Sequence, residues 1–410
     1  MTLERAIKSV VKNGNCSGCG ACAMVSSRVE MSLTGDGFLR PVVASSDSRD
    51  SDILREEQRL FRRVCPGVGV ASYRSSGQAL SSLFGRAVSV WEGAACDATV
   101  RDLGSSGGVI SALSAWLVES GRAEEVASVA GSSTSPTRSV PVRITSREDA
   151  LRSAGSRYAP VSTLSGLVVD ALPGAIVAKP CEASALRAFV GSDPVDSSPI
   201  VISFFCAGTP SQLATDRLAE RLGFEVDEVA SLRYRGNGWP GEFTVEGRSG
   251  GSATMSYEES WGGHLGRRLQ SRCKVCVDGT GEAADISVGD YWEADDQGYP
   301  SFASAPGSSV IFARTQRGHD LLLAAAGAGI ISLSAIDLGR VEAVQPLQRW
   351  RKRTLIGRLA GRLLAGMKIP RYQGFGLFSA GIVAPGRTAR AGVGSFIRAV
   401  RDRSEIRGGG

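Results

Sequence analysis

The chain has 410 residues, of which 42% are apolar and 21% charged, and its formal net charge is +6. These values are typical of a folded protein with two or three domains rather than a disordered one. The first twenty residues lack the apolar core of a signal peptide, and the longest charge-free apolar run, residues 321–336, is shorter than the ~20 residues that span a bilayer. We therefore expect a cytoplasmic protein.

Along the chain, the expected elements alternate between strands and helices. Residues 1–75 are predicted to form a small cysteine-bearing module, in which the polar stretch 45–58 indicates a loop. In the body, residues 85–345, the apolar patterns predict strands and helices in alternation, which favours an α/β fold with a mixed sheet. The strands are expected within 174–180, 199–205 and 284–292, and the helices within 109–121, 181–190 and 210–224. A C-terminal segment, residues 346–410, follows, and its Gly- and Arg-rich end predicts a flexible tail.

The N-terminal module carries a run of cysteines with two residues between successive members. Cys16, Cys19 and Cys22 form this run, and Cys65 follows much later, directly before Pro66. Bacterial ferredoxins hold 4Fe–4S clusters with three closely spaced cysteines and a distant Cys-Pro. Four thiolates would also satisfy zinc, but zinc sites usually pair two separate Cys-x2-Cys knuckles. The spacing therefore favours a ferredoxin-like iron–sulfur module over a zinc site, and the reducing cytosol disfavours disulfides.

A second group of cysteines lies in the body of the chain: Cys181, Cys206, Cys273 and Cys276. Cys181 and Cys206 each follow an expected strand and precede an expected helix. Since the carboxyl ends of strands form the binding edge of an open α/β sheet, these two residues and the Cys273–Cys276 knuckle could hold a second cluster. The alternative is that Cys181 and Cys206 are small buried apolar residues. Cys96 is left over, and we expect it to be structural.

The chain resembles the coenzyme F420 hydrogenase/dehydrogenase beta-subunit family in seven segments that follow family order. They are CSGCGACA, LGSSGGVISALSAWLVESG, AGSRYAP, AKPCEASALRAF, ISFFCAGTPS, YRGNGWPGEF and RCKVCVDGTGEAADISVGDYW, within about residues 10–315. The resemblance implies a mixed α/β flavoprotein that binds FAD, one or two 4Fe–4S clusters and usually coenzyme F420. In such proteins the flavin exchanges a hydride with F420 and single electrons with the clusters. All four cysteines of the second group lie in these segments, which strengthens their assignment as cluster ligands.

A Gly/Ser loop precedes the helix expected from residue 109. Its members Ser105, Ser106, Gly107 and Gly108 combine glycines, which let the backbone approach a phosphate, with hydroxyl donors. The helix N-terminus adds free amides and the positive end of a dipole. Under the family resemblance, we interpret this loop as a flavin contact. The alternative is a plain helix cap.

Other residues of the family segments are candidates for cofactor contacts. Arg157 could pair with a phosphate and Tyr158 could stack on a ring, although both also suit a surface turn. Lys179 could place a positive charge beside a reduced flavin, or be a solvated strand-end lysine. Asn237 could orient a ring, and Asp290 could tune the flavin or cap a turn. The acidic tail of F420 needs a basic site, for which the candidates are Arg233, Arg235, Arg267, Arg268 and Arg272.

The C-terminal segment is strongly basic. From residue 343 to residue 400 there are eleven Arg or Lys and no Asp or Glu, and apolar residues recur at helical spacing within 349–371. A basic amphipathic helix of this kind can contact an anionic membrane surface peripherally or dock on a partner. The alternative is a helix packed on the parent domain. No motif indicates nucleic-acid binding.

Together these features predict an iron–sulfur flavoprotein oxidoreductase. It would pass electrons between 4Fe–4S clusters and FAD, and a hydride between FAD and coenzyme F420 or a related organic acceptor or donor. Ferredoxin or another redox subunit would be its protein partner. Two alternatives stay open: a ferredoxin-dependent reductase of another substrate that does not use F420, and an electron-relay subunit that is not an enzyme by itself.

Overall fold

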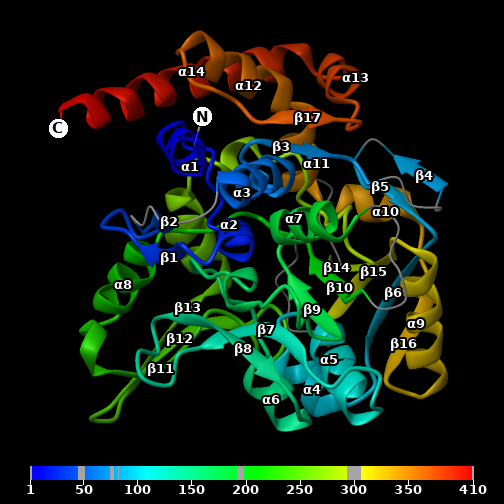
Figure 1. Cartoon of the computed structure of the whole chain (residues 1–410). Helices are drawn as coiled ribbons and strands as arrows, with labels where there is room; N and C mark the ends of the chain where they lie inside the picture. The colour runs from blue at the N-terminus through cyan, green and yellow to red at the C-terminus, as the bar shows by residue number, and fades with distance from the viewer. Residues whose placement is uncertain are drawn as a thin grey trace.

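The computed structural model covers the whole chain and describes residues 2–44, 51–73, 78–81, 83–191, 198–292 and 306–408. A twisted mixed sheet forms its body, the N-terminal helices lie against one side, and the C-terminal helices form a separate layer at the top of Figure 1. In the described residues, no helix has both the length and the apolar character needed to cross a membrane.

The main sheet has eight strands in the described part of the chain, in the order β16-β6-β15-β14-β10-β9-β7-β8. Strands β7, β9, β10 and β14 run parallel to one another, and the other neighbours are antiparallel. The sheet is therefore mixed, as the sequence predicted. The strands are β6 (Ser89–Ala95), β7 (Val126–Gly131), β8 (Ser139–Ile144), β9 (Ala175–Ala178), β10 (Ile200–Phe204), β14 (Ile286–Tyr291), β15 (Ser308–Ala313) and β16 (Ile331–Ala335).

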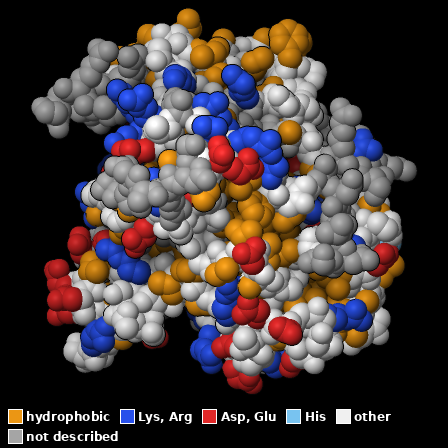
Figure 2. Space-filling view, in the orientation of Figure 1, with side chains coloured by type: hydrophobic (Ala, Val, Ile, Leu, Met, Phe, Trp, Pro, Cys, Tyr) orange, Lys and Arg blue, Asp and Glu red, His pale blue; other side chains and the backbone are white. Residues whose placement is uncertain are grey.

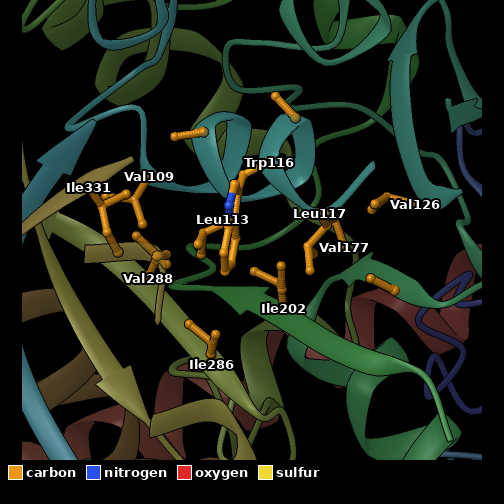
Figure 3. Close-up of a cluster of buried hydrophobic side chains, with 14 of the residues drawn as sticks. Val109, Leu113, Trp116, Leu117, Val126, Val177, Ile202, Ile286, Val288 and Ile331 are labelled. Carbon is orange, nitrogen blue, oxygen red and sulfur yellow. The ribbon is translucent and has the colours of Figure 1, made fainter. Parts of the chain in front are cut away.

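One face of the sheet is covered by α5 (Val109–Glu119), which is apolar on nearly every side. Its Leu113 and Leu117 are almost fully buried against Val177 and Ile202 of the parallel strands, as Figure 3 shows. Burial of this apolar surface is the main stabilising contribution to the fold. The helices α4 (Ala98–Leu103), α6 (Arg147–Arg152) and α9 (Gln316–Gly327) complete this side of the molecule.

The opposite face packs on α7 (Pro180–Val190) and on the N-terminal module. Ile176 and Val201 alternate with the residues that face α5, so they point to the other side and contact Ala183 and Leu186 of α7. Cys19 and Val64 of the module join the same cluster. The module comprises α1 (Leu3–Lys12), α2 (Ala21–Val25), β1 (Val29–Leu33), β2 (Leu39–Val43), α3 (Ser51–Val64) and β3 (Gly69–Ala71).

Smaller elements surround the main sheet. A three-stranded antiparallel sheet packs on α8 (Gln212–Arg221) around Tyr234 and Phe243. Its strands are β11 (Val229–Arg233), β12 (Glu242–Gly247) and β13 (Ser252–Ser256). A short hairpin precedes the main sheet and consists of β4 (Gln78–Ser81) and β5 (Gly85–Ala87). Single helical turns are η1 (Leu164–Gly166), η2 (Val226–Glu228), η3 (Glu258–His264), η4 (Leu265–Arg268) and η5 (Cys273–Val275).

The chain ends in a helical layer that we call the C-terminal module. It contains α10 (Leu338–Ala343), α11 (Pro346–Arg353), α12 (Leu355–Leu364), β17 (Arg371–Gln373), α13 (Leu377–Ile382) and α14 (Pro385–Gly408). Strand β17 pairs in parallel with β3, so this module joins the N-terminal one. Where the composition predicted a flexible tail, the structure has α13 and α14.

The strands and helices predicted within the body are confirmed as β9, β10, β14, α5, α7 and α8. The loop predicted for 45–58 is wrong from residue 51 onward, because α3 begins there; residues 45–50 lie outside the described residues. Helix α3 buries Phe61 and Val64, and its Glu57 pairs with Arg28 at 3.2 Å. The many charges of its exposed side concealed this narrow buried stripe.

Candidate functional site

A pocket with a volume of about 220 Å³ lies where the parallel strands β9, β10 and β14 end. This is the edge at which an open α/β sheet normally binds ligands. Val177, Phe204 and Val288 form an apolar floor, and loops from other elements complete the wall. Of the predicted contacts, the lining includes Ser105, Ser106, Gly108, Arg157, Tyr158, Lys179 and Asp290.

The Gly/Ser loop between α4 and α5 forms one wall. Ser106 Oγ donates to the carbonyl of Ser308 at 2.5 Å, and the amide of Gly107 donates to Ser309 Oγ at 3.0 Å. Gly107 itself is not in the lining. Gly108 adopts φ +70°, and a Cβ there would lie 2.7 Å from the carbonyl oxygen of Val100, so only glycine fits. Glycine thus lets the loop pack closely against α4, and serine hydroxyls fix it to β15.

Helix α5 begins at this loop, with its first turn toward the pocket. Gly108 is its N-cap residue and provides no side-chain cap, while Val109, Ile110 and Ser111 line the pocket. The first amides of a helix have no intrahelical partner and carry partial positive charge. This end of α5 therefore suits an anionic group such as a phosphate.

Arg157 and Tyr158 line the pocket next to the Gly/Ser loop, since the amide of Ser156 donates to Ser105 Oγ at 2.6 Å. The guanidinium of Arg157 donates to Ser139 Oγ at 3.0 Å, to the carbonyl of Leu232 at 3.0 Å and to that of Arg138 at 3.1 Å. These bonds leave it few N–H groups for a phosphate, so it is better suited to fixing the wall. The ring of Tyr158 lies 4.8 Å from that of Trp261, centroid to centroid, and presents an aromatic edge to the pocket.

Lys179 is buried rather than solvated. Its Nζ pairs with Glu182 Oε1 at 2.9 Å and also donates to the carbonyl of Val161. Burial by itself would lower the pKa of Lys179, but the Glu182 carboxylate together with Cys181 and Cys206 outweighs it, and the pKa lies above its usual range. Lys179 therefore provides a permanent positive charge at the pocket wall.

Arg235 and Asp290 form the most polar point of the pocket. Arg235 is 1% exposed, and its Nη1 lies 2.5 Å from Asp290 Oδ2. The guanidinium is sandwiched between the rings of Trp239 and Tyr257, each 4.6 Å away. Its Nη2 is buried and has no hydrogen-bond partner among the described residues. An unpaired buried donor is costly, so this atom is suited to an acceptor on a bound ligand.

Arg235 was predicted only as one of five arginines that could bind the acidic tail of F420. Of those five, it is the one that lines the pocket. Arg267 and Arg268 are exposed outside it. Asn237 is also exposed and lies outside the lining; it has φ +60° in the turn before Trp239. Its side chain therefore does not reach the pocket, although the turn positions Arg235 and Trp239.

The four cysteines of the first group lie close together in the fold. Cys16, Cys19, Cys22 and Cys65 line one small cavity beside the ring of Phe61, with a volume of about 20 Å³. All four are free thiols, and burial raises the pKa of each. Four thiols around one cavity are the donor set of a 4Fe–4S cluster.

The second group also gathers, although its members come from three parts of the chain. Burial first, and then the nearby Cys273 and Cys276 thiolates, raise the pKa of Cys206 to about 12. For Cys181, burial is again the largest cause of a raised pKa, and Cys19 and Cys276 contribute. Cys181 packs against the same buried cluster that contains Cys19, so the two groups are neighbours. Cys206 also lines the pocket.

Arg272 lies between the two cysteine groups. It is 2% exposed, and it donates to the carbonyl of Pro66, next to Cys65, and to that of Val275, each at 3.2 Å. Its guanidinium is 5.6 Å from the ring of Tyr372 in the C-terminal module. Arg272 therefore brings one buried positive charge to both groups, a placement that spacing could not reveal.

The C-terminal module contributes directly to the site. Arg351 Nη1 donates to the carbonyl of Cys206 at 2.7 Å, and Lys352 pairs with the buried Glu282 at 2.6 Å. Arg362 donates to the carbonyl of Asn13 near the first cysteine group. These cations of the 349–371 stretch are buried, so this part of the module packs on the parent body.

No group of three or more His, Cys, Asp or Glu side chains in the described residues is arranged to hold a metal ion. Cys96 is exposed and lies apart from both groups. The residues that could still hold cofactors are the first cysteine group, which shares one small cavity, and the lining of the pocket with its unpaired Arg235 donor and its glycine wall.

Comparison with known proteins identifies two family models that match in tandem. Both describe the beta subunit of coenzyme F420 hydrogenase/dehydrogenase: the model of its N-terminal part matches residues 90–168, and the model of its C-terminal part matches residues 174–338. Together they cover more than half of the chain and contain the pocket and the second cysteine group.

Three curated relatives are similar over large parts of the chain. The coenzyme F420 hydrogenase subunit beta of Methanococcus voltae is 27% identical over 67% of this chain and 95% of its own length. The F420-dependent formate dehydrogenase 1 subunit beta of Methanococcus maripaludis is 26% identical over 48% of this chain and 50% of its own length. The coenzyme F420-dependent sulfite reductase of Methanocaldococcus jannaschii is 25% identical over 78% of this chain and 47% of its own length. The chain thus spans about half the length of the last two.

Among solved structures, a chain of the F420-reducing NiFe hydrogenase complex from Methanosarcina barkeri is similar, with 22% identity and a TM-score of 0.48. The similarity covers 67% of this chain and 95% of that one.

Proposed function

Because this chain belongs to the coenzyme F420 hydrogenase/dehydrogenase beta-subunit family, we propose that it is an F420-linked oxidoreductase subunit with FAD in the pocket and 4Fe–4S clusters on its cysteine groups. The relatives carry the same link to F420 in their names, and two of them are beta subunits. Ferredoxin or another redox subunit would be the electron partner, and F420 or a related organic molecule the hydride acceptor or donor.

The observation that carries this proposal is the position of Cys206. It lines the pocket at the carboxyl edge of the sheet and lies beside the thiols of Cys273 and Cys276. A cluster on the second group would therefore border a flavin in the pocket. When bound, the flavin supplies hydride exchange with an organic acceptor and single-electron exchange with a cluster.

The chain's own residues would bind and orient these groups. The loop of Ser105, Ser106, Gly107 and Gly108, with the start of α5, suits the diphosphate of FAD. Lys179 and the Nη2 group of Arg235 supply positive charge and a free donor where negative charge develops on a reduced ring. Asp290 holds the Arg235 guanidinium in place through the 2.5 Å contact.

We assign the N-terminal residues 1–75 to a ferredoxin-like 4Fe–4S module with Cys16, Cys19, Cys22 and Cys65 as ligands. Residues 85–345 would form the FAD-binding unit, and residues 346–410 a basic C-terminal unit. Two adjacent cysteine groups with Arg272 between them suit electron transfer from one to the other, because the buried positive charge offsets the negative charge of the thiolates.

The test is anaerobic mixing of the purified protein with reduced coenzyme F420, followed by visible absorbance. We expect the visible flavin absorption to disappear after mixing, with a rate constant of about 10 s⁻¹, which is typical of enzyme turnover. Absence of bleaching with F420, together with bleaching by reduced ferredoxin, would instead indicate a reductase that does not use F420. Bleaching without turnover on an artificial acceptor would indicate a relay subunit.

A further inference from the structure

The C-terminal module leaves a large apolar surface uncovered. Nine of the sixteen large apolar side chains that are exposed in the described residues lie on α12, α13 and α14 or directly after α13. They are Leu363, Leu364, Phe378, Ile382, Val383, Val393, Phe396, Ile397 and Val400, and we call them the apolar patch. Single exposed apolar residues are normal, but five of these nine line one groove, and a grouped patch of this kind marks an interaction site.

A groove runs through the patch. It has a volume of about 610 Å³ and no charged residue in its lining, where Thr388 is the one polar side chain. Leu364, Phe378 and Phe396, from three different helices, stand on its walls. Figure 2 shows apolar side chains along the upper edge of the molecule, over these helices, with Lys and Arg side chains just below them.

Close packing between α12 and α14 keeps the patch exposed. A Cβ on Gly357 would lie 2.1 Å from the carbonyl oxygen of Thr388, and one on Gly361 would lie 2.1 Å from that of Gly392. Ser395 Oγ also donates to the carbonyl of Arg358 at 2.9 Å. These contacts fix the rotation of α14, so its apolar stripe cannot turn inward.

Beside its exposed apolar stripe, α14 has a cationic side. Arg387, Arg390, Arg398 and Arg401 are exposed and recur at spacings that place them on one side of the helix, next to the apolar stripe. No Asp or Glu occurs between residues 343 and 401. The charged residues of α14 up to Arg401 are therefore all positive.

From this juxtaposition we propose that the apolar patch docks on an anionic lipid surface. Such a surface offers an apolar layer for Phe378 and Leu364 and phosphate groups for Arg387 and Arg390, which is the charge pattern of interfacial helices. A second copy of the chain is disfavoured, because a symmetric contact through this face would bring like-charged arginines together. Docking would also hold the Cys273–Cys276 loop near the lipid, since Arg358 of α12 donates to the carbonyl of Lys274 at 3.1 Å.

The experiment is flotation of the purified full-length protein with vesicles of phosphatidylcholine alone or with phosphatidylglycerol added. We expect binding to the anionic vesicles, at least tenfold weaker binding to neutral ones, and a decrease with salt. Phe378→Glu should abolish binding, whereas Val168→Glu, at a similarly exposed apolar residue of the main body, should not. This outcome does not depend on the redox proposal, because no cofactor takes part.

The charge requirement is tested separately. Replacing Arg387 and Arg390 by Gln should weaken binding by roughly fivefold for each arginine. The matched control replaces Arg217 and Arg221, two exposed arginines of α8, and should leave binding unchanged. Circular dichroism verifies that each variant is folded. Equal binding to neutral and anionic vesicles, no binding to either, or a dimer that Phe378→Glu dissociates would each overturn the proposal.

Discussion

At the scale of single residues, the pocket contains one guanidinium, that of Arg235, whose hydrogen-bond donors are only partly paired within the described residues. Arg235 directs one amino group to Asp290 and its Nε to the carbonyl of Pro240 at 2.7 Å. The second amino group is buried and unpaired, while Trp239 and Tyr257 prevent the side chain from turning away. A ligand acceptor at this point would satisfy the last donor.

Arg235→Lys tests this interpretation. Lysine keeps a positive charge for Asp290 but cannot offer the planar second amino group, so we expect FAD affinity to fall by roughly tenfold, measured by fluorescence titration of the flavin-depleted protein. Arg248→Lys, at an exposed arginine that follows the neighbouring strand β12, should leave affinity unchanged. Equal affinity in both variants would show that Nη2 does not contact the flavin.

A second residue acts on stability rather than on the pocket. Asp285, at the start of β14, is fully buried and pairs with Arg187 at 3.3 Å and with Arg317 at 2.7 Å. Burial by itself raises the pKa of Asp285, but the hydrogen bonds from Arg317 and the charge of Arg187 outweigh it, so the pKa lies below its usual value.

Asp285→Asn should lower the free energy of unfolding by about 3–5 kcal/mol at neutral pH, because two guanidinium groups lose their counter-charge. A depressed folded-state pKa means that the carboxylate stabilises the protein above the unfolded-state value of ~3.9 and stops doing so as the pH falls through the folded-state pKa. Urea unfolding should therefore give a difference between the two proteins that is constant above about pH 5 and shrinks below about pH 4. A difference that grows on acidification would contradict this account.

At the scale of elements, sequence patterns gave the strands and helices of the body but not the charged helices at its ends. Strands β9, β10 and β14 are buried on both faces, and their continuous apolar runs are easily recognised. Helix α3 buries only a stripe that includes Glu57 and Phe61, so its composition resembled a loop. Helix α14 buries small residues such as Ser395 and Ala399, and therefore has no conventional apolar core face.

The same distinction applies to the site. Cysteine spacing indicated the first group, since three of its members lie close in sequence and the distant Cys65 is followed by a proline. The second group was predicted because two of its cysteines follow strand ends at one edge of a sheet and all four lie in the family segments, and the Gly/Ser loop because it precedes a helix N-terminus. The direction of an individual long side chain could not be predicted from the sequence. Arg157 donates hydrogen bonds to backbone carbonyls, whereas Arg235 and Arg272 each keep a nitrogen without a partner among the described residues.

Phe61→Ala tests the role that we give to α3. Phe61 is 2% exposed and borders the cavity of the first cysteine group, so its removal should destabilise the protein by about 3–5 kcal/mol and lower the iron content of that group. Flavin content should be retained, because the pocket lies elsewhere. Ile53→Ala, at a position of α3 that is 51% exposed, is the control. Unchanged iron content in a destabilised Phe61 variant would separate α3 from the cluster.

At the scale of the whole molecule, three parts of the chain meet at the cysteines. The N-terminal module contributes the four cysteines of the first group, and the strand ends of the main sheet contribute Cys181 and Cys206. The loop with Cys273 and Cys276 lies under the C-terminal module. Arg351 and Arg362 of that module bond to the backbone next to each group. The C-terminal module therefore joins the parts of the site as well as presenting the apolar patch.

Iron held by both cysteine groups beside a flavin is the central feature of the proposed function. Its most direct test is the determination of iron, acid-labile sulfide, zinc and flavin in the anaerobically purified protein. We expect about eight iron and eight sulfide for each flavin, and about four of each when Cys206 and Cys273 are replaced by Ser. Stoichiometric zinc without sulfide, or full iron and sulfide in that double variant, would contradict it.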